Sequence, residues 1–561
     1  MLKEQVVEPV AERSRHGRKL PPPYRVRDDD GDATAPALAG RDAATHLALP
    51  LAAASTPTHA AARMRQPTPE QSNASPEDAA PPGPSGGRVR RVGLALGVVG
   101  GAVMLLLAPP AGMSGPAWRT AAVAALMAVW WVTEAIPIAA TALVPLVLFP
   151  LLGVAAIGDA AAPYANPVVF LFLGGFLIAG ALQRAGLHRR LALALIAAVG
   201  TRPDRLVLGF LTTAAAISMW VSNTATVVML LPLAAPVVAL VTARGRGDGA
   251  AEPAFEVPLL LSLAYGASLG GLGTLIGTPP NALLAGFMAE THGMRIGFGR
   301  WMLIGVPLAV VSVPITWLLL TRVSFRVGRA AVPGVAESVA AQRRALGPPS
   351  RGELLVGAVA GLTALSWVFQ PLLERLVPGV SDAGIAVAAA LLLFVVPIGG
   401  GRAALDWRTA EGLPWGVLVL FGGGLSLAAA IQRSGLAAWI GGALGALGTL
   451  PLPLVVLLVI AVVVFSGELT SNTASAAALL PLVSSLAVGV GADPLLLTVP
   501  TALAASCGFM LPVGTPPNAI VFGAGRITIP EMVRAGFVLD VVMIALVWAV
   551  SYWFAVPALR G

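Results

Sequence analysis

The chain has 561 residues, of which 56% are hydrophobic and only 11% are charged, and its formal net charge is +8. Soluble domains carry about 25% charged residues, so this composition excludes a string of ordinary soluble domains and indicates an integral membrane protein. The arginines gather at the ends of apolar segments, where they orient spans in a membrane, so the positive charge does not predict nucleic-acid binding.

The N-terminal region differs from the rest of the chain. Residues 1–91 are rich in Pro, Ala, Ser and charge and show no periodic apolar pattern. Such a segment cannot bury enough apolar surface to offset the entropy of ordering, so we predict a disordered tail over 1–91. The start of the chain lacks the apolar run of a signal peptide. The arginines at 88, 90 and 91 precede the first apolar segment and predict a cytoplasmic N-terminus.

From residue 92 onward the chain is a series of apolar segments, and one membrane crossing requires about 20 such residues. The first half, 92–322, contains segments near 93–109, 118–134, 136–154, 167–199, 203–240, 256–290 and 301–322. An Arg-rich stretch at 323–351 predicts a cytoplasmic loop. The second half, 352–558, contains segments near 352–372, 382–400, 413–445, 450–488, 494–524 and 530–558.

The positions of the arginines decide the topology. If the blocks at 203–240 and 450–488 are re-entrant hairpins, the Arg-rich connections all fall on the cytoplasmic side. We therefore predict an all-α polytopic membrane protein with about eleven transmembrane helices plus two re-entrant hairpins. The expected location is the cell (inner or plasma) membrane, with the C-terminus outside.

An internal repeat is the strongest signal in the sequence. Matching segments occur in the same order in both halves, at offsets of 249 and then 237 residues: 180–187 with 429–436, 222–225 with 471–474, 230–233 with 479–482, and 277–282 with 514–519. In the predicted topology each repeat crosses the membrane an odd number of times, so the two repeats are inverted. Inverted repeats are the architecture of many secondary transporters, with the binding site between the repeats.

The Ser-Asn-Thr sequences at 222–224 and 471–473 are polar residues in the middle of apolar blocks. Polar groups in lipid need a partner or a water-lined cavity, and a hairpin tip supplies one. Ser, Asn and Thr are also favoured N-cap residues, and the free N–H groups at the start of the helix that follows attract an anion. The two tips therefore predict an anion site.

The Gly-Thr-Pro-Pro-Asn sequences at 277–281 and 514–518 predict spans that are broken in two. Two prolines fit only the first turn of a helix, and Gly277 permits unusual backbone angles. Backbone carbonyls freed at such a break, together with Ser and Asn oxygens, favour a hard cation. Since no carboxylate is among these ligands, a monovalent ion such as sodium fits better than calcium. A co-bound cation would offset the charge of a dianion in a site without Arg or Lys.

Other interpretations of these residues stay open. Ser, Thr and Asn inside membrane helices often only join helices to one another, although the two copies favour a site. Glu468 lies four residues before Asn472 and is either functional or a structural acceptor. The single cysteine, Cys507, excludes a Cys-based metal site, and the two histidines outside the tail, His188 and His292, are expected at loop positions. A channel or an intramembrane enzyme is therefore not expected.

These motifs, together with the sequence Trp-Val-Thr-Glu-Ala-Ile-Pro at 131–137, are similar to those of the divalent anion/sodium symporters, a family that includes sodium-coupled dicarboxylate carriers. The resemblance covers about residues 92–558. It implies an elevator-type transporter, usually a homodimer, in which a mobile domain carries the site across the membrane on a fixed scaffold.

The resemblance also implies ligands. Two sodium ions would be held by Ser218, Ser222, Asn223 and Gly277, and by Ser471, Asn472 and Gly514. The substrate would meet Asn223, Thr224, Thr278, Asn472, Thr473 and Thr515. The second cation site departs from the first, because Gly467 stands where the first has the hydroxyl of Ser218; Ser466 or Glu468 are candidates to compensate.

The sequence therefore predicts sodium-coupled symport of C4-dicarboxylates such as succinate, malate and fumarate, with sodium as the coupling ion and no other cofactor. Neutral Asn and Thr donors suit several anions, so sulfate or another inorganic dianion is an alternative substrate. A sodium-independent dicarboxylate exchanger is a second alternative, although the basic side chains of such exchangers are not found near these tips.

Overall fold

The computed structural model describes residues 84–245, 255–330, 334–399, 401–444 and 449–560. Most of the predicted tail, residues 1–83, lies outside this part. The first helix, α1 (Pro84–Leu106), begins eight residues before the predicted first half, so the expectation of disorder up to residue 91 is wrong for 84–91. Extending a helix costs far less than starting one, and the apolar span supplies the start.

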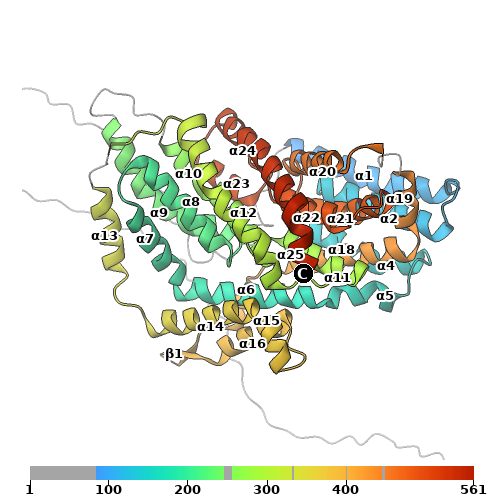
Figure 1. Ribbon diagram of the computed structural model, residues 1–561, viewed down its shortest axis with the longest axis horizontal. Coiled ribbons are helices and arrows are strands. Elements are labelled where there is room, and N and C mark those ends of the chain that lie inside the picture. The colour runs from blue at the N-terminus through green and yellow to red at the C-terminus, as the bar shows by residue number, and fades with distance from the viewer. Residues whose placement is uncertain (1–83, 246–254, 331–333, 400, 445–448, 561) are drawn as a thin grey trace, which may run out of the picture. The chain divides into compact units, whose positions relative to one another are not determined.

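The first half contains the elements that were expected to form one span and one repeat (Figure 1). In order they are α2 (Gly115–Thr133), α3 (Ile138–Thr141), α4 (Val144–Leu151), α5 (Ile157–Ala161), η3 (Ala162–Ala165), α6 (Pro167–Ala185), α7 (Leu187–Val199), α8 (Pro203–Ser218), α9 (Asn223–Gly245), α10 (Glu256–Gly271), α11 (Pro279–His292), α12 (Phe298–Leu318) and the π-helical η4 (Leu319–Ser324).

The second half repeats much of this order. Its elements are α13 (Val335–Ala345), α14 (Arg351–Val368), α15 (Gln370–Leu376), α16 (Asp382–Val395), β1 (Pro397–Gly399), β2 (Arg402–Ala403), α17 (Trp407–Glu411), α18 (Trp415–Arg433), α19 (Leu436–Ala443), α20 (Leu452–Gly467), α21 (Asn472–Gly489), α22 (Leu495–Ala504), α23 (Pro516–Gly523), α24 (Ile529–Val550), the π-helical η6 (Ser551–Ala555) and α25 (Val556–Arg560). From α6 to η4 and from α18 to η6, the two halves have the same sequence of helices.

The helical prediction holds with one exception, because β1 and β2 form a two-stranded antiparallel hairpin. Glycines 399 and 401 adopt positive φ angles of 107° and 70° there, which permits the tight reversal. Eight helices in the described part of the chain are long and apolar enough to cross a membrane. Several shorter apolar helices, such as α20 and α22, belong to spans that the sequence predicts to be broken or re-entrant. The count of eleven spans stays a prediction.

Two of the predicted spans are each divided into two helices. Gly186 separates α6 from α7 with a φ of 77°, and Gly435 separates α18 from α19 with a φ of 83°. The two glycines are related by the 249-residue offset of the repeat. Glycine ends a helix in this left-handed conformation without a steric penalty, so the continuous segments expected at 167–199 and 413–445 change direction at these points.

Helix α10 lies at the centre of the first repeat, with all residues from Val257 to Gly271 buried. It packs against α8 and α9, which lie beside it in Figure 1. A β-carbon at Gly266 would lie 2.5 Å from the carbonyl oxygen of Leu211, and one at Gly270 would lie 2.1 Å from that of Ala215. Small residues allow this close approach of two membrane helices, and it fixes the hairpin of α8 and α9 against α10.

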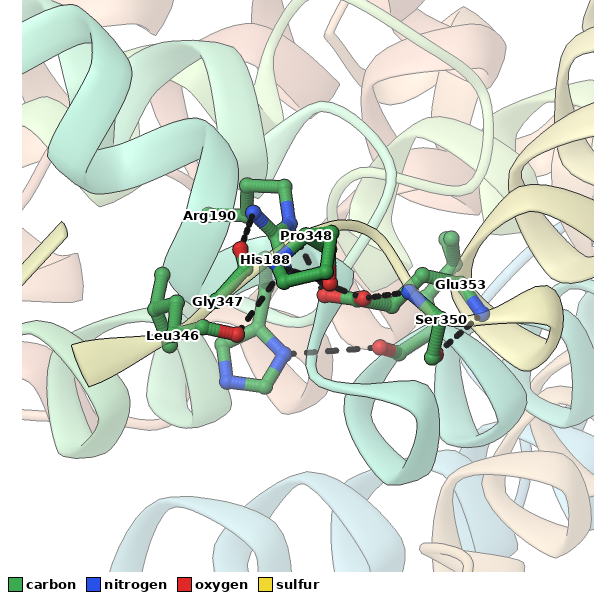
Figure 2. A network of polar contacts seen from close by, with 8 residues as sticks. His188, Arg190, Leu346, Gly347, Pro348, Ser350 and Glu353 are labelled. Carbon is green, nitrogen blue, oxygen red and sulfur yellow. Dashed lines mark hydrogen bonds and ion pairs between the residues drawn. The ribbon is translucent and has the colours of Figure 1, made fainter. Parts of the chain in front are cut away.

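Arg190 fastens α7 to the beginning of α14 (Figure 2). Its guanidinium group donates to both carboxylate oxygens of Glu353, at 3.0 and 3.2 Å, and to the backbone carbonyls of residues 346–348. Glu353 also completes a capping box with Ser350 at the start of α14. The loop between the two halves is thereby tied to the first repeat.

Candidate functional site

Both Ser-Asn-Thr sequences lie where a hairpin turns. Helix α8 ends at Ser218 and α9 begins at Asn223, while α20 ends at Gly467 and α21 begins at Asn472. In the first tip the Ser222 hydroxyl accepts a hydrogen bond from the Ala225 amide at 3.3 Å, which confirms the predicted helix cap.

In the second tip Ser471 occupies the equivalent N-cap position, but its side chain makes no capping hydrogen bond. A short contact of 2.5 Å joins the hydroxyls of Thr470 and Ser475 instead. The interruption of the helix at both tips agrees with the prediction, while side-chain capping at the second tip was wrong.

Both Gly-Thr-Pro-Pro-Asn sequences interrupt a span. Between α10 and α11 the interruption covers residues 272–278, and between α22 and α23 it covers residues 505–515. The prolines occupy the first turn of α11 and α23, as predicted. We refer to these two segments as the first break and the second break.

The reason for glycine at position 277 differs from the prediction. Gly277 does not adopt a positive φ angle. A β-carbon on Gly277 would lie 2.5 Å from the carbonyl oxygen of Gly271, so the backbone of the first break closes upon itself too tightly for any side chain. A close approach of two backbone segments is the second reason for which a chain requires glycine.

Two asparagines that sequence reasoning did not select hold the breaks in shape. The Asn281 side-chain amide donates to the carbonyls of Gly271 and Thr274 at 3.0 and 2.8 Å. Asn518 donates in the same way to Gly508 and Leu511, at 3.1 Å each. The signal for both was present in the sequence, because each asparagine ends a Gly-Thr-Pro-Pro-Asn motif. Their side-chain oxygens are buried and have no hydrogen-bond partner within the described residues.

The first tip and the first break bring together several oxygen atoms. The Asn223 side-chain oxygen lies 2.6 Å from the Ser218 hydroxyl. The same side-chain atom of Asn223 also lies 3.2 Å from the carbonyl oxygens of Ala267 and Gly277. Either the amide turns so that its nitrogen donates to these carbonyls, or a cation lies among the oxygens. Hard cations bind such groups of carbonyl, amide and hydroxyl oxygens, so the residues fit a small monovalent cation.

The second tip and second break repeat this arrangement with one ligand fewer. The Asn472 side-chain amide has an atom 3.1 Å from the carbonyl oxygens of Ala505 and Gly514. Gly467 stands where the first repeat has the Ser218 hydroxyl, and apart from its own helix and chain neighbours no atom lies within 4 Å of the place of a β-carbon there. The hydroxyl of Ser466, one of the two candidates to compensate, donates to the Val463 carbonyl of its own helix at 3.1 Å.

Glu468 instead organises the second break. Its side chain is 1% exposed and accepts hydrogen bonds from the backbone amides of residues 509, 510 and 511, at 2.6, 3.0 and 2.8 Å. The carboxylate thus satisfies three amides that the broken helix leaves without intrahelical partners. The structure supports the interpretation of Glu468 as an acceptor at the second break.

The two breaks also meet each other. The hydroxyls of Thr278 and Ser506 lie 3.3 Å apart, and the Tyr265 hydroxyl donates to the Phe509 carbonyl at 2.9 Å. Thr515 caps α23 by accepting from the Asn518 amide at 3.3 Å. The predicted residues Thr224 and Thr473 directly follow the tip asparagines, on the first turns of α9 and α21. The predicted site residues therefore belong to two tips and two breaks, and the contact between the Thr278 and Ser506 hydroxyls joins one break to the other.

Comparison with known proteins identifies the family of this chain. The family model described as the sodium:sulfate symporter transmembrane region matches residues 89–559. The sodium-dependent dicarboxylate transporter SdcS of Staphylococcus saprophyticus is 41% identical over 477 residues, covering 83% of this chain and 92% of the relative. SdcS of Staphylococcus aureus strain USA300 is 39% identical over 478 residues, covering 84% and 92%.

Among solved structures, the Alcanivorax borkumensis YdaH transporter matches with a TM-score of 0.49 and 15% identity, covering 84% of this chain and 98% of that one. The family match extends from α1 to α25 and includes both tips and both breaks. The chain therefore belongs to the sodium:sulfate symporter transmembrane family, a family of integral membrane transporters.

Proposed function

We propose that the protein is a secondary active transporter that couples the entry of sodium to the uptake of C4-dicarboxylates such as succinate, malate and fumarate. The observation that carries the proposal is the pair of oxygen clusters. Asn223 lies 3.2 Å from the carbonyl oxygens of Ala267 in α10 and Gly277 in the first break, and Asn472 lies 3.1 Å from those of Ala505 and Gly514 in the second break. The relatives named as sodium-dependent dicarboxylate transporters support the choice of ion and substrate.

The residues have distinct roles in this proposal. Ser218, Ser222, Asn223 and Gly277 would hold one sodium ion, and Ser471, Asn472 and Gly514 the other. The substrate carboxylates would meet side chains of the two tips and two breaks: Asn223, Thr224, Thr278, Asn472, Thr473 and Thr515. The positive ends of α9 and α21 favour an anion at this place. Two sodium ions would offset the dianion's charge in a medium of low dielectric constant.

The wider mechanism belongs to the same proposal. The chain would act as a homodimer, with the tips and breaks on a mobile domain that moves as an elevator between two inverted repeats. The N-terminus would lie in the cytoplasm and the C-terminus outside. The glycines at 186 and 435, which separate α6 from α7 and α18 from α19, support such a motion because each places a change of chain direction between two rigid helices.

Sulfate, or another inorganic dianion, is the second candidate substrate, and it is favoured by the name of the matching family, the sodium:sulfate symporters. The sites for the cations would be the same, and only the anion would differ. A sodium-independent exchanger is the remaining alternative.

Uptake of labelled succinate into proteoliposomes, with and without an inward sodium gradient, tests the proposal. Asn223→Ala and Asn472→Ala should each abolish sodium-driven uptake. Asn166→Ala is a matched control, because Asn166 caps α6 by accepting from Val168 at 3.0 Å and belongs to neither tip. Uptake that ignores sodium would refute symport in favour of exchange. Uptake of sulfate that succinate does not inhibit would refute the dicarboxylate.

A further inference from the structure

A pocket of about 630 Å³ lies between α7, α9 and α13, which pack against one another (Figure 1). None of the residues that line it belongs to the tips or the breaks, so it is separate from the proposed cation and substrate sites. Helix α13 is part of the Arg-rich segment 323–351, which the sequence predicts to be a cytoplasmic loop. The proposed topology therefore places the pocket at the cytoplasmic surface of the membrane.

One wall of the pocket is polar and positively charged. It consists of His188 and Arg189 in the first turn of α7, and of Ser338 and Gln342, which are one turn apart on α13. Arg, Ser and Gln side chains all offer hydrogen-bond donors. Within the described residues no acidic side chain lines the pocket. This wall therefore suits an anion.

The charge of Arg189 is not compensated by the protein. Its neighbour Arg190 is committed to Glu353 and to the backbone carbonyls of residues 346–348, which fixes the first turn of α7 (Figure 2). None of the ion pairs among the described residues includes Arg189. A guanidinium group held beside a pocket without a carboxylate partner is suited to bind a carboxylate or phosphate group from outside the protein.

The opposite wall is apolar. It is one face of α9, formed by Met229, Pro232, Leu233 and Pro236, and the two prolines on it are exposed. A small free anion gains nothing from such a surface, whereas an amphipathic anion uses both walls. A phospholipid has this chemistry, because a charged phosphate is joined to apolar chains.

Helix α7 has the character of a helix that lies in the membrane interface. Its first turn is basic, while further along Leu191 is 49% exposed and Ala192, Leu193 and Ile196 are buried. Basic residues next to exposed apolar ones are typical of helices at the level of the lipid headgroups. The open side of the pocket is therefore expected to meet headgroups.

We propose that this pocket binds the headgroup phosphate of an anionic phospholipid from the cytoplasmic leaflet. Arg189 would be the principal ligand, with Ser338 and Gln342 as further donors, and the glycerol and first acyl carbons would lie against α9. Basic pockets between membrane helices on this side of a membrane are suited to such headgroups. The lipid would connect the first tip hairpin, through α9, to α13 and to the start of α7, and would thereby regulate the motion of the hairpin. This effect on transport rests on the proposed function, whereas binding does not.

Binding is tested by native mass spectrometry of the purified protein with equal amounts of phosphatidylglycerol and phosphatidylcholine. We expect phosphatidylglycerol to be retained in preference, and Arg189→Gln to weaken its binding about fivefold, the effect of one arginine near anionic lipid. Arg205→Gln is the matched control, because Arg205 is exposed in the first turn of α8 and does not line the pocket. It should leave the preference unchanged.

Equal retention of the two lipids would overturn the inference, and so would equal losses in Arg189→Gln and Arg205→Gln, since the second result assigns the preference to general surface charge. If millimolar inorganic phosphate displaced phosphatidylglycerol, the pocket would be a site for free anions and the lipid would be excluded.

The regulatory part is tested by succinate uptake in proteoliposomes of phosphatidylcholine with and without phosphatidylglycerol. We expect the anionic lipid to change the uptake rate of the unaltered protein and of Arg205→Gln, but not that of Arg189→Gln. The same response in all three proteins would overturn regulation through this pocket. Absence of sodium-driven uptake under every condition would instead refute the proposed function and leave the binding result standing.

Discussion

The replacement Gly467→Ser should strengthen the second cation site. In the first site the Ser218 hydroxyl lies 2.6 Å from the Asn223 side-chain oxygen, and Gly467 is the equivalent residue of the second repeat. A β-carbon at Gly467 meets no atom within 4 Å, so a serine fits without displacing its neighbours. The substitution would supply the ligand that the second repeat lacks.

The size of the effect follows from two contributions. A net hydrogen-bonding or liganding interaction of a hydroxyl is worth about 0.5–1.5 kcal/mol, which corresponds to about a 2- to 12-fold lower sodium concentration for half-maximal transport. Replacing glycine in the last turn of α20 adds about 0.5–1 kcal/mol of helix stability for alanine and less for serine. Gly467→Ala therefore isolates the effect of the hydroxyl from that of the helix.

The assay is the sodium dependence of succinate uptake in proteoliposomes, measured for Gly467→Ser, Gly467→Ala and Ser218→Ala. We expect the serine variant to need less sodium, the alanine variant to match the unaltered protein, and Ser218→Ala to need more. If Gly467→Ser and Gly467→Ala had equal sodium requirements while Ser218→Ala needed more sodium than the unaltered protein, the two sites would not be built alike. That result would refute the transfer of ligands from the first repeat to the second.

Three further predictions concern the breaks and the loop before α18. Gly277→Ala forces a β-carbon to within 2.5 Å of the Gly271 carbonyl and should cost about 1–3 kcal/mol at the first cation site, seen as a raised sodium requirement. Asn281→Leu removes two hydrogen bonds to the first break and should lower the melting temperature in detergent; unchanged stability would contradict its role in holding the break. Hydrogen bonds from Thr409 hold the pKa of Asp406 at about 2 instead of 3.8, so the stability from this carboxylate is present above about pH 4 and lost as the pH falls toward 2. Asp406→Asn should remove that part of the acid dependence, measured by unfolding at decreasing pH.

Much of the site was predictable because its residues break the rules of a membrane helix. Ser-Asn-Thr and Pro-Pro are costly inside apolar segments, and their repetition at fixed offsets excluded coincidence. The tips and breaks of the structure lie at these positions. The same logic would have identified Asn281 and Asn518, which end both copies of the break motif.

Other features left no such trace in the sequence. Asp540 is completely buried in α24, yet it stands outside both copies of the repeated motifs, so comparison of motifs passes over it. Gly277 was assigned a conformational role, although its close contact with Gly271 depends on tertiary structure. The hairpin of β1 and β2 is too short and too rich in glycine to show a strand pattern.

The two repeats connect tip and break by opposite means, and this difference bears on how the sites work. In the first repeat the Thr274 hydroxyl of the break donates to the Met219 carbonyl of the tip at 2.6 Å. In the second, Leu511 takes the place of Thr274, and the tip supplies Glu468 to accept from the amides of the break. The backbone geometry is conserved between the halves while one of them gains a negative charge. A neutral first site and a charged second site would bind the same cation with different strength, so equal sodium affinities at the two sites would contradict this electrostatic distinction.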